Sequence, residues 1–274
     1  MPDELKRVLI LCKTYPTPSS KYSETSCVAG MEESGKLIRI FPVPFRLIEN
    51  DAQFKKWQWI KARMRKASND HRPESHHIYV DTIELEGEPL STAHDWLSRR
   101  QAIEGVQVFD DFDALEQARQ TKGITLGLVR PSKLLSLDIT PTSHPEWTPA
   151  ELANLMKEQN QGHLFEAEVE EKSLRLLKKL PFDFHYHYEC QTSSGIKIFK
   201  HKINDWEAGA YYWNVQKKPN WQTMMRERWV SGFAKKDVLF LMGTMHRFPD
   251  QWLIVSVIYP PKPLAERAGQ VALF

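Results

Sequence analysis

The sequence predicts an α+β fold made of two β-rich lobes that carry helical insertions. Short apolar or alternating runs, bounded by Gly, Pro, Asn or Asp, recur along the chain and are typical of strands. Segments that begin with a capping residue lie between these runs and indicate helices. The chain has 274 residues, of which 41% are hydrophobic and 26% charged, so its length and composition suit a packed core.

The first lobe is expected to span residues 1–150 as a mixed β domain. Its predicted strands lie at residues 7–14, 76–86, 124–131 and 133–140, and a predicted hairpin over 25–43 turns at Glu-Glu-Ser-Gly. Residues 57–64 could form a strand or a helix, and their alternation favours a strand. Two helices are expected in this lobe, one over 91–103 with Ser91 as its cap and one over 111–120.

The second lobe is expected to span residues 163–263, after a proline-rich boundary between about residues 140 and 162 and a short helix at 149–157. It begins with a charged helix that ends at Pro181. Along 182–190, Phe, Tyr and Cys alternate with Asp, His and Glu, which predicts a strand with one apolar and one polar face. The remaining predicted elements are a strand at 196–203, helices at 205–215 and 220–233, and buried strands at 237–244 and 252–259.

The composition favours a cytoplasmic protein. No apolar run approaches the roughly 18 residues of a membrane span, and the first residues lack a signal-peptide cleavage pattern. Three cysteines, Cys12, Cys27 and Cys190, are too few for a disulfide framework. The net charge of +2 does not by itself require a nucleic-acid partner, so local clusters of charge carry more information.

One such cluster lies at residues 54–67, which hold six Lys or Arg and two Trp. Basic residues interleaved with Trp suit phosphate contacts beside base stacking, whereas the alternative is a solvated strand or helix face with a buried Trp. The residues predicted to contact DNA are Arg39, Arg46, Lys55, Lys56, Lys61, Arg63, Arg65 and Arg72.

Cys27 is the candidate nucleophile of an enzyme, although a lone cysteine is also a common small core residue. Glu24 or His76 would carry the proton, and His246 is a further candidate because it lies in a connection between two buried strands. The loop over 70–77 either binds a phosphate through Arg72, positions Glu74 and His76 for proton transfer, or is a plain polar loop.

No cofactor is required by the sequence. His185 and His187 project from one face of a predicted strand, a spacing that can chelate zinc, and His201 could join them from the paired strand. Cys190 lies on the opposite face, which weakens a three-ligand site, so the metal content stays open.

Residues 264–274 are expected to form a flexible tail. Gln270, Leu273 and Phe274 give the pattern Gln-x-x-Leu-Phe, which resembles the peptide by which many bacterial proteins dock on the DNA polymerase sliding clamp. Leu and Phe would fill an apolar pocket while the amide satisfies polar groups at its rim. The alternative is that Leu273 and Phe274 tuck into the core of the chain itself.

Five segments, KTYPTPSSKYSETSCVAG, RIFPVPFR, RPES, DWE and FLMGTMHRFPDQWLIVSVIYPP, together resemble a family of uncharacterised bacterial proteins over nearly the whole chain. Members of that family look like residents of DNA-modification or phage-defence islands. One relation that the resemblance implies is to the systems that place 7-deazaguanine bases in DNA, where an enzyme converts a base-borne nitrile to an amide. Relatives carry additional Cys and His after the position of Cys190, and this sequence does not, which puts a zinc site in doubt.

Two functions remain open on the sequence. The first is a hydrolase or hydratase that acts on a modified base in DNA, with Cys27 as nucleophile and the tail as a recruitment signal. The second is a non-catalytic DNA-binding or adaptor subunit that docks on the sliding clamp. Titratable residues that converge in one pocket would favour the first function, and an open basic groove would favour the second.

Overall fold

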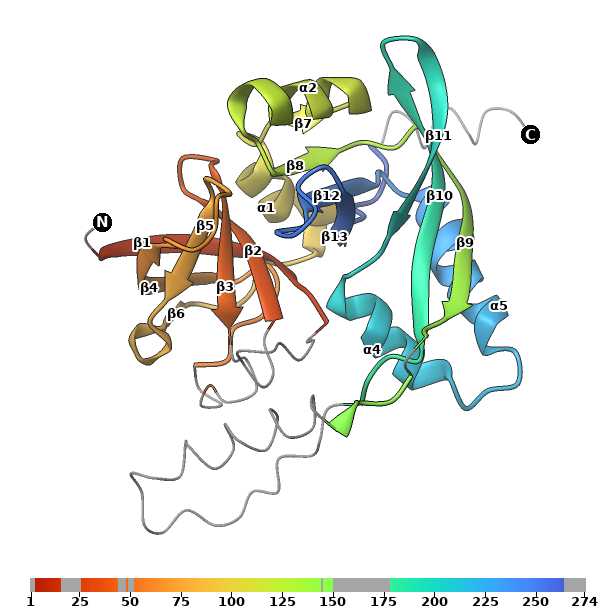
Figure 1. The fold of residues 1–274 in the computed structure, drawn as a ribbon, viewed down its shortest axis with the longest axis horizontal. Helices are drawn as coiled ribbons and strands as arrows, with labels where there is room; N and C mark the ends of the chain where they lie inside the picture. Colours follow the sequence, from red (N-terminus) through yellow and green to blue (C-terminus); the bar gives the residue numbers. More distant parts are fainter. Residues whose placement is uncertain are drawn as a thin grey trace.

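The computed structural model describes residues 3–15, 26–43, 48, 52–143, 145–149 and 178–263. These residues form three sheets with helices between them, and strand outweighs helix, so the predicted α+β class is confirmed (Figure 1). Figure 1 shows a β-barrel at the N-terminal side, a second sheet at the centre and a third, long sheet on the opposite side.

The first sheet closes into a barrel of five strands, which are β1 (Glu4–Lys13), β2 (Ser26–Glu32), β3 (Leu37–Val43), β4 (Trp59–Lys66) and β5 (Ser75–Ile78). The strand order is β1-β2-β3-β5-β4, and β1 also pairs with β4, which returns the sheet to its first strand. Only β3 and β5 run parallel among these neighbours. This is the topology of the OB-fold, a five-stranded Greek-key barrel. A short strand, β6 (Glu84–Glu86), extends the sheet beyond β4.

Alternate residues of each strand fill the barrel. Its interior is a cluster of buried aliphatic residues, listed as Val8, Ile10, Val28, Ile38, Ile40, Val43, Ile60, Ala62 and Met64. Because successive side chains of a strand point to opposite faces, the residues between these positions face outward from the barrel.

The other two sheets follow the barrel in the chain. The second contains β7 (Val108–Phe109), β8 (Leu126–Val129), β12 (Leu239–Thr244) and β13 (Trp252–Ile258), in the order β13-β12-β8-β7. The third contains β9 (Lys133–Pro141), β10 (Phe182–Thr192) and β11 (Gly195–Lys202), in the order β11-β10-β9. One core cluster joins the second and third sheets, because Phe240 and Met242 pack with Tyr186 and Tyr188.

The second sheet covers the outward face of the barrel. Leu9, Ala29 and Met31 point out of the barrel and share a core cluster with Leu128 and Leu241. In OB-folds the face of strands 2 and 3 commonly binds oligonucleotides or oligosaccharides. Here Ala29 and Met31 of β2 and Arg39 of β3 are buried on that face, so it is not open to a ligand.

Aspartate side chains cap the N-terminal ends of two helices. Asp111 caps α2 (Phe112–Lys122) by accepting from the backbone N–H of Asp113 at 2.7 Å. Asp205 caps α4 (Trp206–Val215) by accepting from the backbone N–H of Glu207 at 2.9 Å. The predicted second helix of this region is α5 (Trp221–Arg226), which continues as a π-helical turn over Glu227–Gly232.

Two predicted elements differ in the structure. The helix predicted over 91–103 is α1 (Ala93–Ile103), but His94, Asp95 and Trp96 have left-handed backbone angles, so a regular helix begins only after them. The single strand predicted at 76–86 is divided into β5 and β6 by a 3-10 turn at Val80–Thr82. Alternation alone carries no signal for a turn of this length.

The alternation predicted along β10 is confirmed, because Tyr186, Tyr188 and Cys190 are buried while the residues between them are partly exposed. The predicted helices at 149–157 and before Pro181 and the predicted tail at 264–274 lie largely or wholly outside the described residues. The domain boundary at 140–162 stays a prediction; β8 and β9 precede it and pair with β12 and β10, which follow it. Within the described ranges, no helix is long and apolar enough to cross a bilayer.

Candidate functional site

A buried arginine lies beside Cys27 where the barrel meets the second sheet. Arg39 is on β3 opposite Ala29 of β2, so its side chain leaves the barrel on the covered face. It is only 3% exposed, and its Nη1 lies 3.8 Å from the Cys27 sulfur. Cys27 itself is half-buried. The cross-strand pairing of β2 and β3 therefore places a thiol against a fixed cation.

Glu74 and Thr125 hold this guanidinium in place. Arg39 donates from Nε and Nη2 to Glu74 Oε1 at 3.3 and 3.2 Å, and from Nη2 to the Thr125 carbonyl at 3.0 Å. The hydroxyl of Thr125 donates to the same carboxylate oxygen. Gly243 leaves the necessary room, since a Cβ at that position would lie 3.2 Å from Arg39 Nη2. These hydrogen bonds hold the guanidinium beside Cys27.

The charge on Arg39 is stabilised despite its burial. Burial acts to lower the pKa of Arg39, but the neighbouring Cys27 sulfur and Glu74 carboxylate outweigh it, so the pKa is raised. A buried charge of this kind depends on its partner, because an arginine left alone in the interior would carry the full desolvation penalty.

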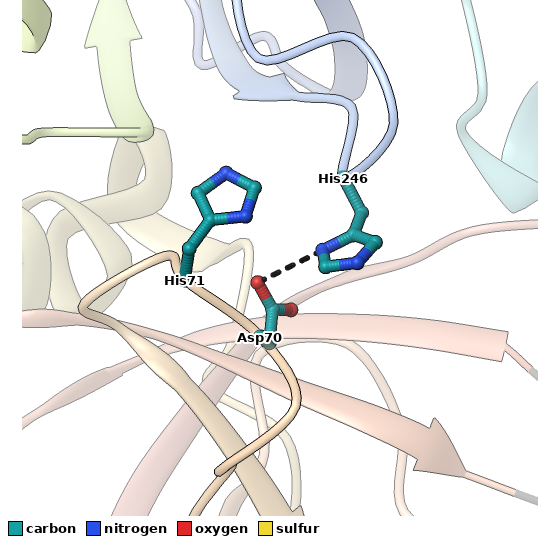
Figure 2. A group of neighbouring side chains, drawn as sticks. All are labelled: Asp70, His71 and His246. Atoms are coloured by element: carbon teal, nitrogen blue, oxygen red, sulfur yellow. Dashed lines mark hydrogen bonds and ion pairs between the residues drawn. The ribbon is translucent and has the colours of Figure 1, made fainter.

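A second polar cluster lies on the loop that joins β4 to β5. Arg72 is buried and donates to both carboxylate oxygens of Asp70, at 2.9 and 2.6 Å, and to the Thr244 carbonyl at 2.8 Å. Figure 2 shows Asp70 and His71 on this loop and His246 reaching toward them from the loop between β12 and β13. His246 Nδ1 lies 3.3 Å from Asp70 Oδ1, and the rings of His71 and His246 stack with centroids 5.1 Å apart.

Asp70 stays ionised. Burial acts to raise its pKa, but hydrogen bonds from Arg72 and the charge of Arg72 hold the pKa of this carboxyl well below its usual range. The two clusters are also connected, because the backbone N–H of Thr244 donates to the Thr125 carbonyl at 3.0 Å. A continuous chain of contacts therefore runs from Cys27 to His246.

A small pocket of about 220 Å³ opens beside the Arg39 cluster. It lies between β3, the β4–β5 loop, the end of α2 and the start of β8, and Glu74 and Thr125 form part of its wall. Lys36 and Lys122 also line it, whereas Cys27 and His246 do not. The pocket is smaller than those that usually hold drug-sized ligands.

Two family models cover the chain. One, described as a domain of unknown function (DUF8757), matches residues 108–274, which is most of the chain. The chain belongs to this family. The other, described as a domain of unknown function (DUF8758), matches residues 4–105. The barrel and α1 form the DUF8758 region, and the second and third sheets lie in the DUF8757 region. Cys27, Arg39 and Glu74 come from the first region and Thr125 from the second, so the site lies where the two regions meet.

Other comparisons add little. No curated protein matches the chain. A solved structure of a replication protein A heterotrimer bound to single-stranded DNA is similar with a TM-score of 0.26 and 7% identity, over 99% of this chain and 69% of that one. A likeness at that level supports no conclusion about fold or function, and the barrel topology above rests on the strand pairing alone.

Of the predicted proton carriers that the structure describes, His76 and His246 make their contacts away from Cys27. His76 is buried, its Nδ1 lies 2.8 Å from the Glu74 carbonyl, and burial lowers its pKa. The charges that act on it are those of Lys6, Lys66 and Glu32, and Glu32 is at the opposite end of β2 from Cys27. His246 joins Asp70 instead. Glu24 and Arg46 lie outside the described residues, as do Gln270, Leu273 and Phe274.

The predicted DNA contacts divide into two groups. Arg39, Arg72 and Lys56 are engaged inside the DUF8758–DUF8757 junction rather than at the surface. Lys56 Nζ lies 3.2 Å from Glu207 and 3.6 Å from Asp205, and these two carboxylates help to raise the pKa of this amine although burial opposes them. Of the other described ones, Lys61, Arg63 and Arg65 are on the outward face of β4 and Lys55 precedes this strand; Lys55, Arg63 and Arg65 are exposed and Lys61 is half-buried.

The histidines considered for zinc do not gather in one place. His187 Nε2 lies 2.8 Å from Asp138, while His201 is on the inner face and its Nδ1 lies 2.9 Å from the Tyr188 hydroxyl. Among the described residues, the group that could hold a metal ion is Asp70, His71 and His246.

Sequence reasoning missed two features of the site. The Cys27–Arg39 contact could have been predicted, because the predicted hairpin places these residues on the same face of adjacent strands, in diagonal positions. The contact of Thr125 with Glu74 could not have been predicted, because the two residues are 51 positions apart in sequence and no local pattern links them.

Proposed function

We propose that the protein acts on nucleic acid and that Cys27 is the nucleophile of its reaction. The observation that carries this proposal is the 3.8 Å contact between the Cys27 sulfur and the buried Arg39 guanidinium. The thiolate is the nucleophilic form of cysteine, and a cation beside it stabilises that form. Thr14 holds the Cys27 backbone in place. Its hydroxyl accepts from the Cys27 backbone N–H at 3.0 Å, and its own backbone N–H donates to the Cys27 carbonyl at 2.9 Å.

The other two cysteines provide a contrast within the same chain. Cys12 and Cys190 are fully buried, and their thiols face backbone carbonyl oxygens, that of Val255 at 2.8 Å and that of Arg130 at 3.7 Å. Burial raises the pKa of Cys12 and raises that of Cys190 to about 11. These are the properties of core thiols, and Cys27 shares neither the full burial nor the carbonyl partner.

Nucleic acid is the proposed substrate class because of β4. Lys61, Arg63 and Arg65 alternate along its outward face, where they can contact successive phosphates. The covered face of the barrel cannot receive a strand of nucleic acid, so we propose that it follows the outward face of β4 toward the β4–β5 loop.

The family resemblance extends the proposal to a nitrile on a modified base, such as a 7-deazaguanine. The Cys27 thiolate would add to the nitrile carbon, and the nitrogen would take a proton from solvent to give a thioimidate. Water would then add to the same carbon, and the sulfur would leave, which yields the amide with one water consumed. Arg39 would stabilise the sulfur anion at the start and at the end of this sequence.

Site-resolved alkylation tests the thiol. We expect iodoacetamide to modify Cys27 at pH 7, and Arg39→Gln to slow that modification, because the substitution removes the guanidinium that lies 3.8 Å from the sulfur. Glu74→Gln keeps Arg39 but removes the charge of its hydrogen-bond acceptor, so we expect this variant to slow alkylation less than Arg39→Gln does. If alkylation of Cys27 proceeds at the same rate in folded wild type and folded Arg39→Gln, the proposed activation is wrong.

A second function, binding of DNA without catalysis, is favoured by the basic row on β4. Substitution of Lys61, Arg63 and Arg65 by Ala should weaken binding of every sequence alike and reduce the salt dependence by about one unit of slope per lost phosphate contact. Cys27→Ala separates the two functions, since it should leave DNA binding intact and abolish turnover. Absence of binding at low salt would exclude both.

A further inference from the structure

We propose that Asp70, His71 and His246 form a binding site for a divalent transition-metal ion, with zinc as the best match. One potential ligand atom from each residue lies within 4.8 Å of the others. Two imidazoles and one carboxylate are a common ligand set for zinc in proteins. The site is separate from Cys27, so this inference does not depend on the proposed reaction.

The geometry needs little adjustment to hold the ion. Two ligands of a tetrahedral zinc ion at bond lengths near 2.1 Å are about 3.4 Å apart. The present spread of up to 4.8 Å therefore has to close by about 1.4 Å. His71 and His246 are exposed on loops, the latter with half of its side chain in solvent, so both rings can rotate without disturbing the core. Figure 2 shows a nitrogen of each ring on the side that faces Asp70.

Asp70 is held as a ligand by its surroundings. Arg72 donates to this carboxylate from two guanidinium nitrogens and from its backbone N–H, and its guanidinium also donates to the Thr244 carbonyl. An outer group that fixes the orientation and ionisation of a ligand is the usual companion of a metal site. The charge of Arg72 also offsets that of Asp70, so we expect micromolar rather than nanomolar affinity.

The proposed ion would connect two parts of the chain. His246 is 176 residues from Asp70 and belongs to the DUF8757 region, whereas Asp70 and His71 belong to the DUF8758 region. The ion would fix the β12–β13 loop against the β4–β5 loop. Three protein ligands also leave a fourth position for water or for a phosphate oxygen, as in zinc sites that act on a ligand.

Titration of the EDTA-treated 274-residue chain with ZnCl₂ by calorimetry tests the site. We expect one ion per chain, with His71→Ala and His246→Ala each lowering the affinity at least about tenfold. His187→Ala is the matched control, because His187 forms a similar partly exposed pair with Asp138 on the third sheet and should leave zinc binding unchanged. Cys27→Ser should also leave it unchanged, which separates this site from the thiol.

Thermal unfolding gives a second readout, since an ion that binds only the folded chain raises the melting temperature. Zinc should raise that of wild type and of His187→Ala, and not that of His71→Ala or His246→Ala. Asp70→Asn is the third ligand variant, and zinc should not raise its melting temperature. Circular dichroism that matches wild type shows that this variant is folded. No zinc binding at millimolar concentration, or binding that survives both histidine substitutions, would overturn the proposal.

Discussion

Removal of the Glu74 carboxylate should destabilise the protein more than removal of any surface carboxylate. In Glu74→Ala, the Arg39 guanidinium would stay 3% exposed but lose both of its contacts to Oε1, and the Thr125 hydroxyl would lose its acceptor. Loss of one partner of a buried ion pair costs about 3–5 kcal/mol. For a chain of this size, that lowers the melting temperature on the order of 10 °C.

Two variants show whether the cause is the unpaired charge. Asp183→Ala is the control, because Asp183 pairs with Lys202 at 2.6 Å on the surface and exposed pairs contribute about 1 kcal/mol or less. A double variant, Arg39→Met with Glu74→Leu, removes both charges and should be less destabilised than the sum of the single variants.

The assay is urea unfolding followed by circular dichroism, with thermal unfolding as a check. If Glu74→Ala costs no more than Asp183→Ala, or if the double variant equals the sum of its parts, then Arg39 does not depend on Glu74 and the description of this cluster is wrong.

Two further predictions concern acidity and the tail. Burial lowers the pKa of His201 from 6.5 to about 4, so between these pH values the unfolded chain binds a proton that the folded chain does not. The free energy of unfolding should therefore fall as the pH drops from 6.5 to 4. His201→Phe should make this pH dependence weaker, and an unchanged dependence would show that His201 does not cause it. Deletion of Leu273 and Phe274 should abolish binding to a sliding clamp, measured with immobilised clamp, and leave the melting temperature unchanged; a fall of many degrees would instead place these residues in the core.

The strands and helix caps were predictable because their signals are local. The alternation along β10 and the caps at Asp111 and Asp205 each depend on residues within a few positions of one another. Asp205 has a second role that was not predictable, which is to join distant segments. Its carboxylate accepts from the Ser256 hydroxyl at 3.1 Å and lies 3.6 Å from Lys56 Nζ. That role depends on how distant segments meet.

The barrel was not predictable for the same reason. Its closure requires β1 to pair with both β2 and β4, and a strand pattern does not reveal which strands are neighbours. Arg39 shows the consequence for the site. On the sequence it is an outward polar residue of a hairpin and suits a phosphate contact, but the second sheet covers that face and turns it into a buried partner of Glu74 and Cys27.

The covered face of the barrel decides whether either family region could stay in solution without the other. Their borders are only a few residues apart, yet the surface between them is core: Leu9 and Met31 on one side pack with Leu128, Leu241 and Val255 on the other. A chain cut at that border would present both apolar surfaces to water, and such surfaces promote aggregation. We therefore expect either region made alone to need a substitute partner to stay in solution.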